Sequence, residues 1–194
     1  MRWSMIPRIN ADLILPPVTS VGPGTGTVRS PYSASISEVV QRFSTTIERA
    51  AILRGLLTYR QAVIGLGMTD GHMWLDGSFV ENIEAKAKRP PNDIDLVTFA
   101  VIPAGSLAEK DELRKRVPEV FDPDEAKRRF RCDAHFVDLA EPLSMILKNT
   151  CYWYGLFSHQ RDSNRWKGML QVPLLSDDSV AGVILRQAEQ SLGG

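Results

Sequence analysis

The chain has 194 residues, and its 23 basic side chains balance 23 acidic ones, so the formal net charge is zero. This length suits one domain with a real core and a short additional segment. A neutral chain lacks the basic surplus typical of non-specific nucleic-acid binding, which leaves only a local basic face open. No apolar run approaches the length of a membrane span, and the N-terminus has no apolar signal core. We therefore expect a cytoplasmic protein without membrane contact.

The first 34 residues contain Pro16-Pro17, Pro23, Pro31 and several glycines. Prolines at this density prevent a long helix or a central strand. Residues 1–34 are therefore predicted to form an extended N-terminal arm, packed either on the body or on a partner. The remaining residues, 35–194, form the predicted domain.

The domain alternates helix and strand patterns. A helical pattern, in one long or two shorter pieces, precedes the rest and ends near residue 67. Strands are then predicted at 72–76, 93–101, 132–139 and 169–173, and helices at 106–117, 123–130, 141–157 and 177–192. Residues 83–92 are rich in lysine, arginine and proline and predict a loop. The order indicates an α/β (α+β) fold with a small mixed sheet flanked by helices.

Two cysteines, Cys132 and Cys151, have no CxxC spacing. They are predicted to be buried free thiols and not a disulfide or a zinc site.

Two aspartates begin the most clearly apolar strand. Asp93 and Asp95 are two positions apart, so on a strand they share one face. Such a pair can hold Mg²⁺, which prefers oxygen ligands; a solvated edge strand is the alternative. Gly77 and Ser78 end the preceding strand, where a glycine allows the backbone to approach a phosphate. By itself this Gly-Ser pair indicates no more than a turn.

The stretch 74–99, WLDGSFVENIEAKAKRPPNDIDLVTF, combines these features. A strand, Gly-Ser, a connector and then Asp-x-Asp on an apolar strand resembles the signature of the polymerase-beta-like nucleotidyltransferase superfamily. The resemblance implies a nucleotidyltransferase core in which Gly77 and Ser78 bind the triphosphate and Asp93 and Asp95 hold one or two Mg²⁺ ions. Two metals would neutralise charge at the entering and leaving oxygens. The connector is slightly longer here than is usual for the superfamily.

The same resemblance implies a third carboxylate on the strand at 132–139. Asp133 and Asp138 are the candidates, and their separation of five positions places them on opposite faces of a regular strand. We favour Asp133 as the metal ligand, with a strand-entry cap as its alternative. His135 would share the face of Asp133, either beside the metals or as a structural histidine.

Basic and aromatic side chains concentrate late in the chain. Residues 152–174 read YWYGLFSHQRDSNRWKGMLQVPL, where core packing or a partner interface explains the aromatics better than base stacking does. Lys148 and Lys167 are candidate nucleotide-binding residues, with solvated surface lysines as the alternative. The run Lys127-Arg128-Arg129 is the strongest local basic cluster and is suited to steering RNA or nucleotide.

Beyond this motif, the chain is similar to a group of bacterial nucleotidyltransferase-like proteins of unknown function. The similarity involves Leu15-Pro16-Pro17 and the segments 37–54, 74–97 and 152–174, and so covers most of the chain. Related small nucleotidyltransferases act in toxin–antitoxin or phage-defence loci, some by transferring nucleotide to a protein or a tRNA. A likeness of this kind implies fold more directly than activity.

Two functions are compatible with these observations. The first is a Mg²⁺-dependent transferase that moves a nucleoside monophosphate from ATP or another NTP to a protein or RNA acceptor, with Asp93, Asp95 and Asp133 as catalytic residues. The second is a catalytically silent module of the same fold, such as an antitoxin, adaptor or nucleotide sensor that binds a co-encoded protein. The small size of the domain favours the second, and the intact Asp-x-Asp favours the first.

Overall fold

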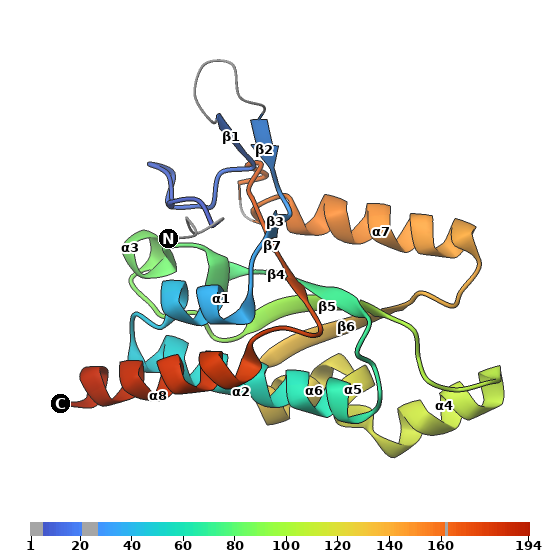
Figure 1. Cartoon of the computed structure of the whole chain (residues 1–194). Coiled ribbons are helices and arrows are strands. Elements are labelled where there is room, and N and C mark those ends of the chain that lie inside the picture. The colour runs from blue at the N-terminus through green and yellow to red at the C-terminus, as the bar shows by residue number, and fades with distance from the viewer. Residues whose placement is uncertain (1–5, 21–26, 162) are drawn as a thin grey trace.

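The computed structural model describes residues 6–20, 27–161 and 163–194 (Figure 1). Its centre is a five-stranded sheet in the order β3-β7-β4-β5-β6. The strands are β3 (Tyr32–Ser33), β7 (Leu170–Pro173), β4 (Gly71–Asp76), β5 (Ile94–Ala100) and β6 (Cys132–Asp138). β3 is parallel to β7 and β5 to β6, whereas β4 is antiparallel to both of its neighbours. The predicted mixed α/β class is confirmed.

Helices cover both faces of this sheet. Figure 1 shows α1, α2, α5, α6 and α8 on one side and α7 on the other, while α4 lies at one end. The bounds are α1 (Ile36–Phe43), α2 (Ile47–Gly65), α3 (Ile83–Ala87), α4 (Leu107–Arg116), α5 (Pro118–Phe121), α6 (Pro123–Phe130), α7 (Leu143–Phe157) and α8 (Asp178–Gly193). A short 3-10 helix, η1 (Ser78–Val80), follows β4.

The alternation of side chains along the strands gives the sheet two different faces. Leu75 and Leu96 lie in the main core with side chains of α1, α2, α6 and α8. Trp74 and Val97 point the other way and form a smaller cluster with Phe157 of α7. The face toward α7 therefore carries the smaller of the two apolar clusters.

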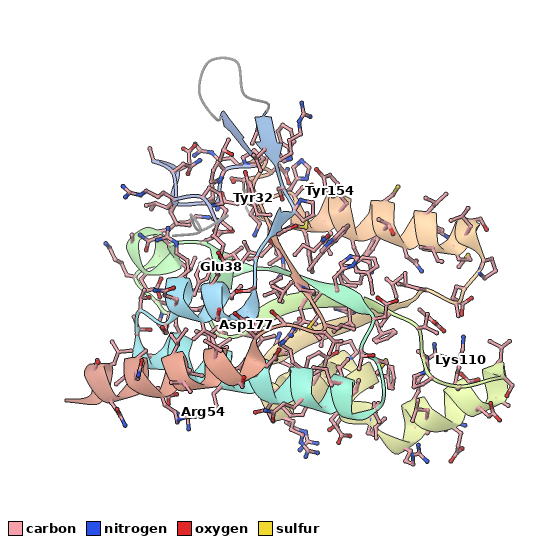
Figure 2. The ribbon with its side chains drawn as sticks, viewed as in Figure 1. Tyr32, Glu38, Arg54, Lys110, Tyr154 and Asp177 are labelled. Atoms are coloured by element: carbon pink, nitrogen blue, oxygen red, sulfur yellow. The ribbon has the colours of Figure 1, made fainter. Side chains whose placement is uncertain are left out.

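Local sequence explains where two of the helices begin. Ser35 caps α1 and Ser106 caps α4, each in a capping box with a glutamate three positions later. Glu38, which completes the first box, lies close to Asp177 in Figure 2, at adjacent ends of α1 and α8. Asp177 Oδ1 accepts the backbone N–H of Ser37 at 3.1 Å, so a residue beside the α1 cap also fixes α8.

The N-terminal arm, predicted for residues 1–34, packs on the body where the structure describes it. Strands β1 (Val18–Ser20) and β2 (Thr27–Arg29) pair antiparallel, and β3 adds a strand to the edge of the main sheet. Leu15 is fully buried, and its carbonyl accepts the N–H of Gly168 at 2.8 Å. The end of the arm is therefore built into the fold.

Two local predictions are wrong. Residues 83–92 are not a loop throughout, because they contain α3, whose N-terminus is capped by Asn82 through a hydrogen bond from the N–H of Ala85. The loop had been predicted from Pro90 and Pro91, which lie beyond the end of this short helix. Cys151 is exposed and not buried, whereas Cys132 is buried as predicted, and both thiols are free.

The apolar side chains of α7 are largely uncovered. Leu143 and Leu147 are 70% and 56% exposed, and Phe157 is the one buried residue of this fully described helix. Tyr154, labelled in Figure 2, contacts Trp74, so the helix meets the sheet through its C-terminal part. Across the described ranges, no helix is both long and apolar enough to span a membrane.

A buried ion pair joins α4 to the end of β6. Lys110, labelled in Figure 2, donates to Asp138 Oδ2 at 2.6 Å, and both side chains are nearly inaccessible. Burial by itself would raise the pKa of Asp138. The hydrogen bonds from Lys110 and from the N–H groups of Ala140 and Ile102 outweigh burial and hold this pKa below its ordinary value of 3.8.

This ion pair predicts a pH dependence of stability. Because the folded pKa lies below the unfolded one, Asp138 stabilises the fold above about pH 4, and this contribution is lost as the pH falls through the folded value. We expect the urea midpoint of the wild type to fall more between about pH 6 and about pH 3 than that of Asp138→Asn. An equal fall of the urea midpoint in the two proteins would show that the pKa of Asp138 is not lowered by folding.

Candidate functional site

Three aspartates lie side by side at one end of the sheet. Asp95 of β5 pairs in register with Asp76 of β4 on one side and with Asp133 of β6 on the other. All three follow the alternation that faces α7, and Asp93 shares that face because it precedes Asp95 by two positions. The structure thus brings together the three predicted carboxylates and adds Asp76, which the sequence reasoning missed although it directly precedes Gly77.

These aspartates line a cleft of about 830 Å³, a volume in the range of small-molecule sites. The cleft is also lined by Tyr152 and Trp153 of α7 and by three basic residues, Lys86 of α3, Arg89 and Arg161. An acidic group is therefore faced by both aromatic and basic side chains.

Gly77 shapes the bottom of this cleft. Its φ of 80° and ψ of −167° lie in a region that is essentially restricted to glycine. A Cβ at this position would stand 2.0 Å from Asp95 Oδ2. The glycine therefore lets the chain turn out of β4 while its backbone passes directly against Asp95. Ser78, which starts η1, also lines the cleft.

Lys167 lies under the turn that contains Gly77. It is 2% exposed, and its Nζ lies 3.1 Å from both Asp76 Oδ1 and Glu81 Oε1 and donates to Gly77 O at 3.2 Å. Gln160 donates to the other oxygen of Glu81 at 2.7 Å. Because Lys167 is buried, the solvated-surface alternative is wrong for this residue. Its predicted role in nucleotide binding stays a prediction.

The buried charges shift each other's pKa values. Burial by itself would lower the pKa of Lys167, but Asp76 and Glu81 outweigh burial and raise it. The pKa of Asp76 is raised to about 7, chiefly by burial and also by the charge of Asp95, although Lys167 lowers it. The pKa of Asp95 is also raised, first by burial and then by the charges of Asp93 and Asp133. Burial and neighbouring carboxylates thus both disfavour the charged forms of Asp76 and Asp95.

A second lysine lies at the other end of the acidic row. Lys127 of α6 places its Nζ 2.6 Å from Asp93 Oδ2 and 3.2 Å from Asp133 Oδ2, and the hydrogen bonds to these carboxylates raise its pKa. His135 Nε2 lies 3.1 Å from Asp133 Oδ1, and its ring centroid is 4.5 Å from that of Trp153. His135 is therefore beside the predicted ligand, a position compatible with both of its predicted roles.

The donor set of the cleft fits a hard divalent cation, because it consists of carboxylate oxygens. Asp76 Oδ1 is buried and receives no directed hydrogen bond from any described residue, although Lys167 lies within ion-pairing distance. As the side chains stand, the described part of the chain contains no group of three or more acidic, histidine or cysteine residues arranged to hold a metal. The Lys127 ammonium lies among the carboxylates instead. Metal binding by Asp93, Asp95 and Asp133 stays a prediction.

Two other candidates lie away from this cleft. Lys148 is exposed on α7 and is not among the residues that line the cleft, so the structure does not bring it to the aspartates. Asp138, the alternative to Asp133, is paired with Lys110 as described above. Asp133 and Asp138 lie on opposite faces of β6, as their separation of five positions predicted.

The mixed sheet and its acidic cleft define an α/β protein with a carboxylate-rich site. A model of a family of unknown function, DUF6932, matches residues 7–173. The chain therefore belongs to this family. None of the curated proteins and none of the solved structures matches the chain significantly. The family brings no assigned activity with it, so the resemblance to nucleotidyltransferases stays a prediction.

Proposed function

We propose that this protein is a Mg²⁺-dependent nucleotidyltransferase that transfers a nucleoside monophosphate from an NTP to a protein or RNA acceptor. One observation carries the proposal, namely the row of Asp76, Asp95 and Asp133 on adjacent strands, with Asp93 beside them, in a cleft of about 830 Å³. Crowded carboxylates facing basic side chains suit a metal-bound polyphosphate. The resemblance of the motif supports the same reading and adds toxin–antitoxin or phage defence as its setting.

In the proposed reaction, an acceptor oxygen forms a bond to the α-phosphorus while the bond from that phosphorus to pyrophosphate breaks, and the acceptor proton passes to water. Bound Mg²⁺ would supply charge neutralisation and activation of the acceptor hydroxyl. Asp93, Asp95 and Asp133 would hold the ion, and Gly77 and Ser78 would take the triphosphate. The close approach of the Gly77 backbone to Asp95 would keep phosphate and metal ligands together.

A label-transfer assay tests the proposal. Wild type and Asp93→Asn/Asp95→Asn would be incubated with Mg²⁺ and each α-labelled NTP, with total RNA or cell lysate as acceptor. We expect label on a specific RNA or protein band with the wild type and none with the variant, because the metal ligands are removed. Asp111→Asn is a matched control, since Asp111 is an exposed aspartate of α4. Absence of label from folded wild type with every NTP would refute the transferase.

A catalytically silent binding module is the second candidate, and α7 favours it. Leu143, Leu147 and Tyr152 are 70%, 56% and 61% exposed on this helix. Clustered exposed apolar side chains often mark interaction surfaces. Such a module would bind a co-encoded protein as an antitoxin, adaptor or nucleotide sensor. A complex that forms equally well with Asp93→Asn/Asp95→Asn would support this candidate, provided that the wild type also transfers no label.

A further inference from the structure

A lysine lies where the proposed function needs a cation. Lys127 reaches from α6 to the starts of β5 and β6, and its ammonium contacts Asp93 Oδ2 at 2.6 Å and Asp133 Oδ2 at 3.2 Å. These are two of the three carboxylates proposed to hold Mg²⁺. A single ammonium therefore bridges two proposed ligands and competes for the oxygens that the metal would use.

We infer that Lys127 is a built-in counter-ion that occupies the carboxylate cluster until a divalent cation displaces it. The inference rests on the proposed function, because it takes Asp93 and Asp133 as metal ligands. It adds that metal affinity is set by competition with a side chain of the same protein. Lys127 is thus a regulatory residue of the site and not a ligand.

The surroundings of Lys127 allow it to leave. Its side chain is 48% exposed and extends from the surface helix α6, so its flexible stem can carry the ammonium into solvent. Half-exposed ion pairs are weak, and a divalent ion brings twice the charge to the same oxygens. The other lysine contacting the aspartates of the cleft, Lys167, is 2% exposed, and its ammonium is held by Asp76, Glu81 and Gly77 O. Of these two lysines, only Lys127 is placed to exchange.

The charge of the cluster explains why a counter-ion is present. Asp95 lies in register with Asp133 of β6 and shares its strand face with Asp93, two positions before it. Three carboxylates this close repel one another when no cation is bound. Lys127 relieves that repulsion at Asp93 and Asp133 and leaves Asp95 without a direct lysine partner. Lys127 therefore lowers the electrostatic repulsion in the metal-free cluster, and the charge that remains still favours binding of a divalent ion.

The test is a Mn²⁺ titration followed by the electron paramagnetic resonance signal of free Mn²⁺, without nucleotide. We expect Lys127→Met to bind Mn²⁺ about tenfold more tightly than the wild type, because the competing ammonium is gone. Lys86→Met is the matched control. Lys86 also lines the cleft, but its ammonium lies 3.9 Å from Glu81 Oε2 and does not contact Asp93 or Asp133. We expect at most about a twofold gain there, from the general change in charge.

Three outcomes separate the inference from the proposed function. Equal Mn²⁺ affinity in wild type and Lys127→Met, with binding lost in Asp93→Asn/Asp95→Asn, would leave the metal site intact and overturn the counter-ion. An equal gain in Lys127→Met and Lys86→Met would also overturn it, because the effect would then be one of net charge. Absence of Mn²⁺ binding in every variant would overturn both the counter-ion and the metal site.

Displacement has a second readout that does not depend on the variants. Reductive methylation of Lys127, followed by mass spectrometry, should become faster when Mn²⁺ is added to the wild type, because the released ammonium is free to react. Lys148 is exposed on α7 and away from the cleft, so its rate should not change. A Lys127 rate that stays constant while Mn²⁺ binds would show that the two cations do not compete.

Discussion

Lys167→Met is expected to lower the free energy of unfolding by about 3–5 kcal/mol, since it removes one partner of a buried ionic cluster. Lys167 is 2% exposed and contacts Asp76, Glu81 and the carbonyl of Gly77. Without it, two nearly inaccessible carboxylates lose their shared counter-ion. The hydrogen bond from Gln160 to Glu81 remains, but an amide cannot replace the missing charge.

Urea denaturation followed by circular dichroism measures this effect. Lys148→Met is the control, because the same substitution at an exposed position of α7 should change stability by no more than about 0.5 kcal/mol. Asp76→Asn/Lys167→Met should be more stable than Lys167→Met, since one buried charge is neutralised. If Lys167→Met matched its control, the cluster would not hold the turn after β4 as the contacts indicate.

Gly77→Ala is expected to cost about 2–4 kcal/mol of unfolding free energy, from backbone strain and from contact with Asp95. Its φ is 80°, and the added Cβ would stand 2.0 Å from Asp95 Oδ2 and 2.8 Å from Asp95 Cγ. Asp95 would have to move away from the Gly77 backbone and leave its present place in the carboxylate cluster. We therefore also expect Mn²⁺ binding and label transfer to fall, since both depend on that side chain.

Gly67→Ala separates the effect of backbone strain from the effect of contact with Asp95. Gly67 has a φ of 91°, but no described atom lies within 4 Å of the Cβ that would be added there. It should show a backbone cost of about 1–3 kcal/mol and no loss of Mn²⁺ binding. If both variants bound Mn²⁺ as the wild type does, the contact between Gly77 and Asp95 would not matter for the site.

Periodicity predicted the fold well because most elements bury one side against the sheet. The strand at Cys132–Asp138 and the helix opened by Ser106 lie close to their predicted bounds, since alternation and capping are local signals. The exposure of apolar side chains on α7 could not be predicted in this way. An apolar pattern states which side chains are apolar and does not state which of them a neighbour covers. Leu143 and Leu147 have no such neighbour among the described residues.

The site was predicted only where strand geometry sufficed. The placement of Asp93, Asp95 and Asp133 on one face follows from positions two apart and from the parity of a strand. Asp76 pairs with Asp95 through strand register, and Lys127 reaches the cluster from a separate helix. These placements depend on pairing between elements, for which a single sequence carries no local pattern.

Contacts between N-terminal and C-terminal elements determine when this chain can fold during synthesis. β3 hydrogen-bonds to β7, α1 packs on α8, and the N–H of Ser37 is held by Asp177. Because a ribosome delivers the N-terminal elements first, α1 emerges long before its partners and has to keep its apolar face uncovered meanwhile. Contacts of such long sequence separation form slowly. The acidic cleft, whose turn after β4 is held by Lys167, can likewise be completed only after residue 167 has been synthesised.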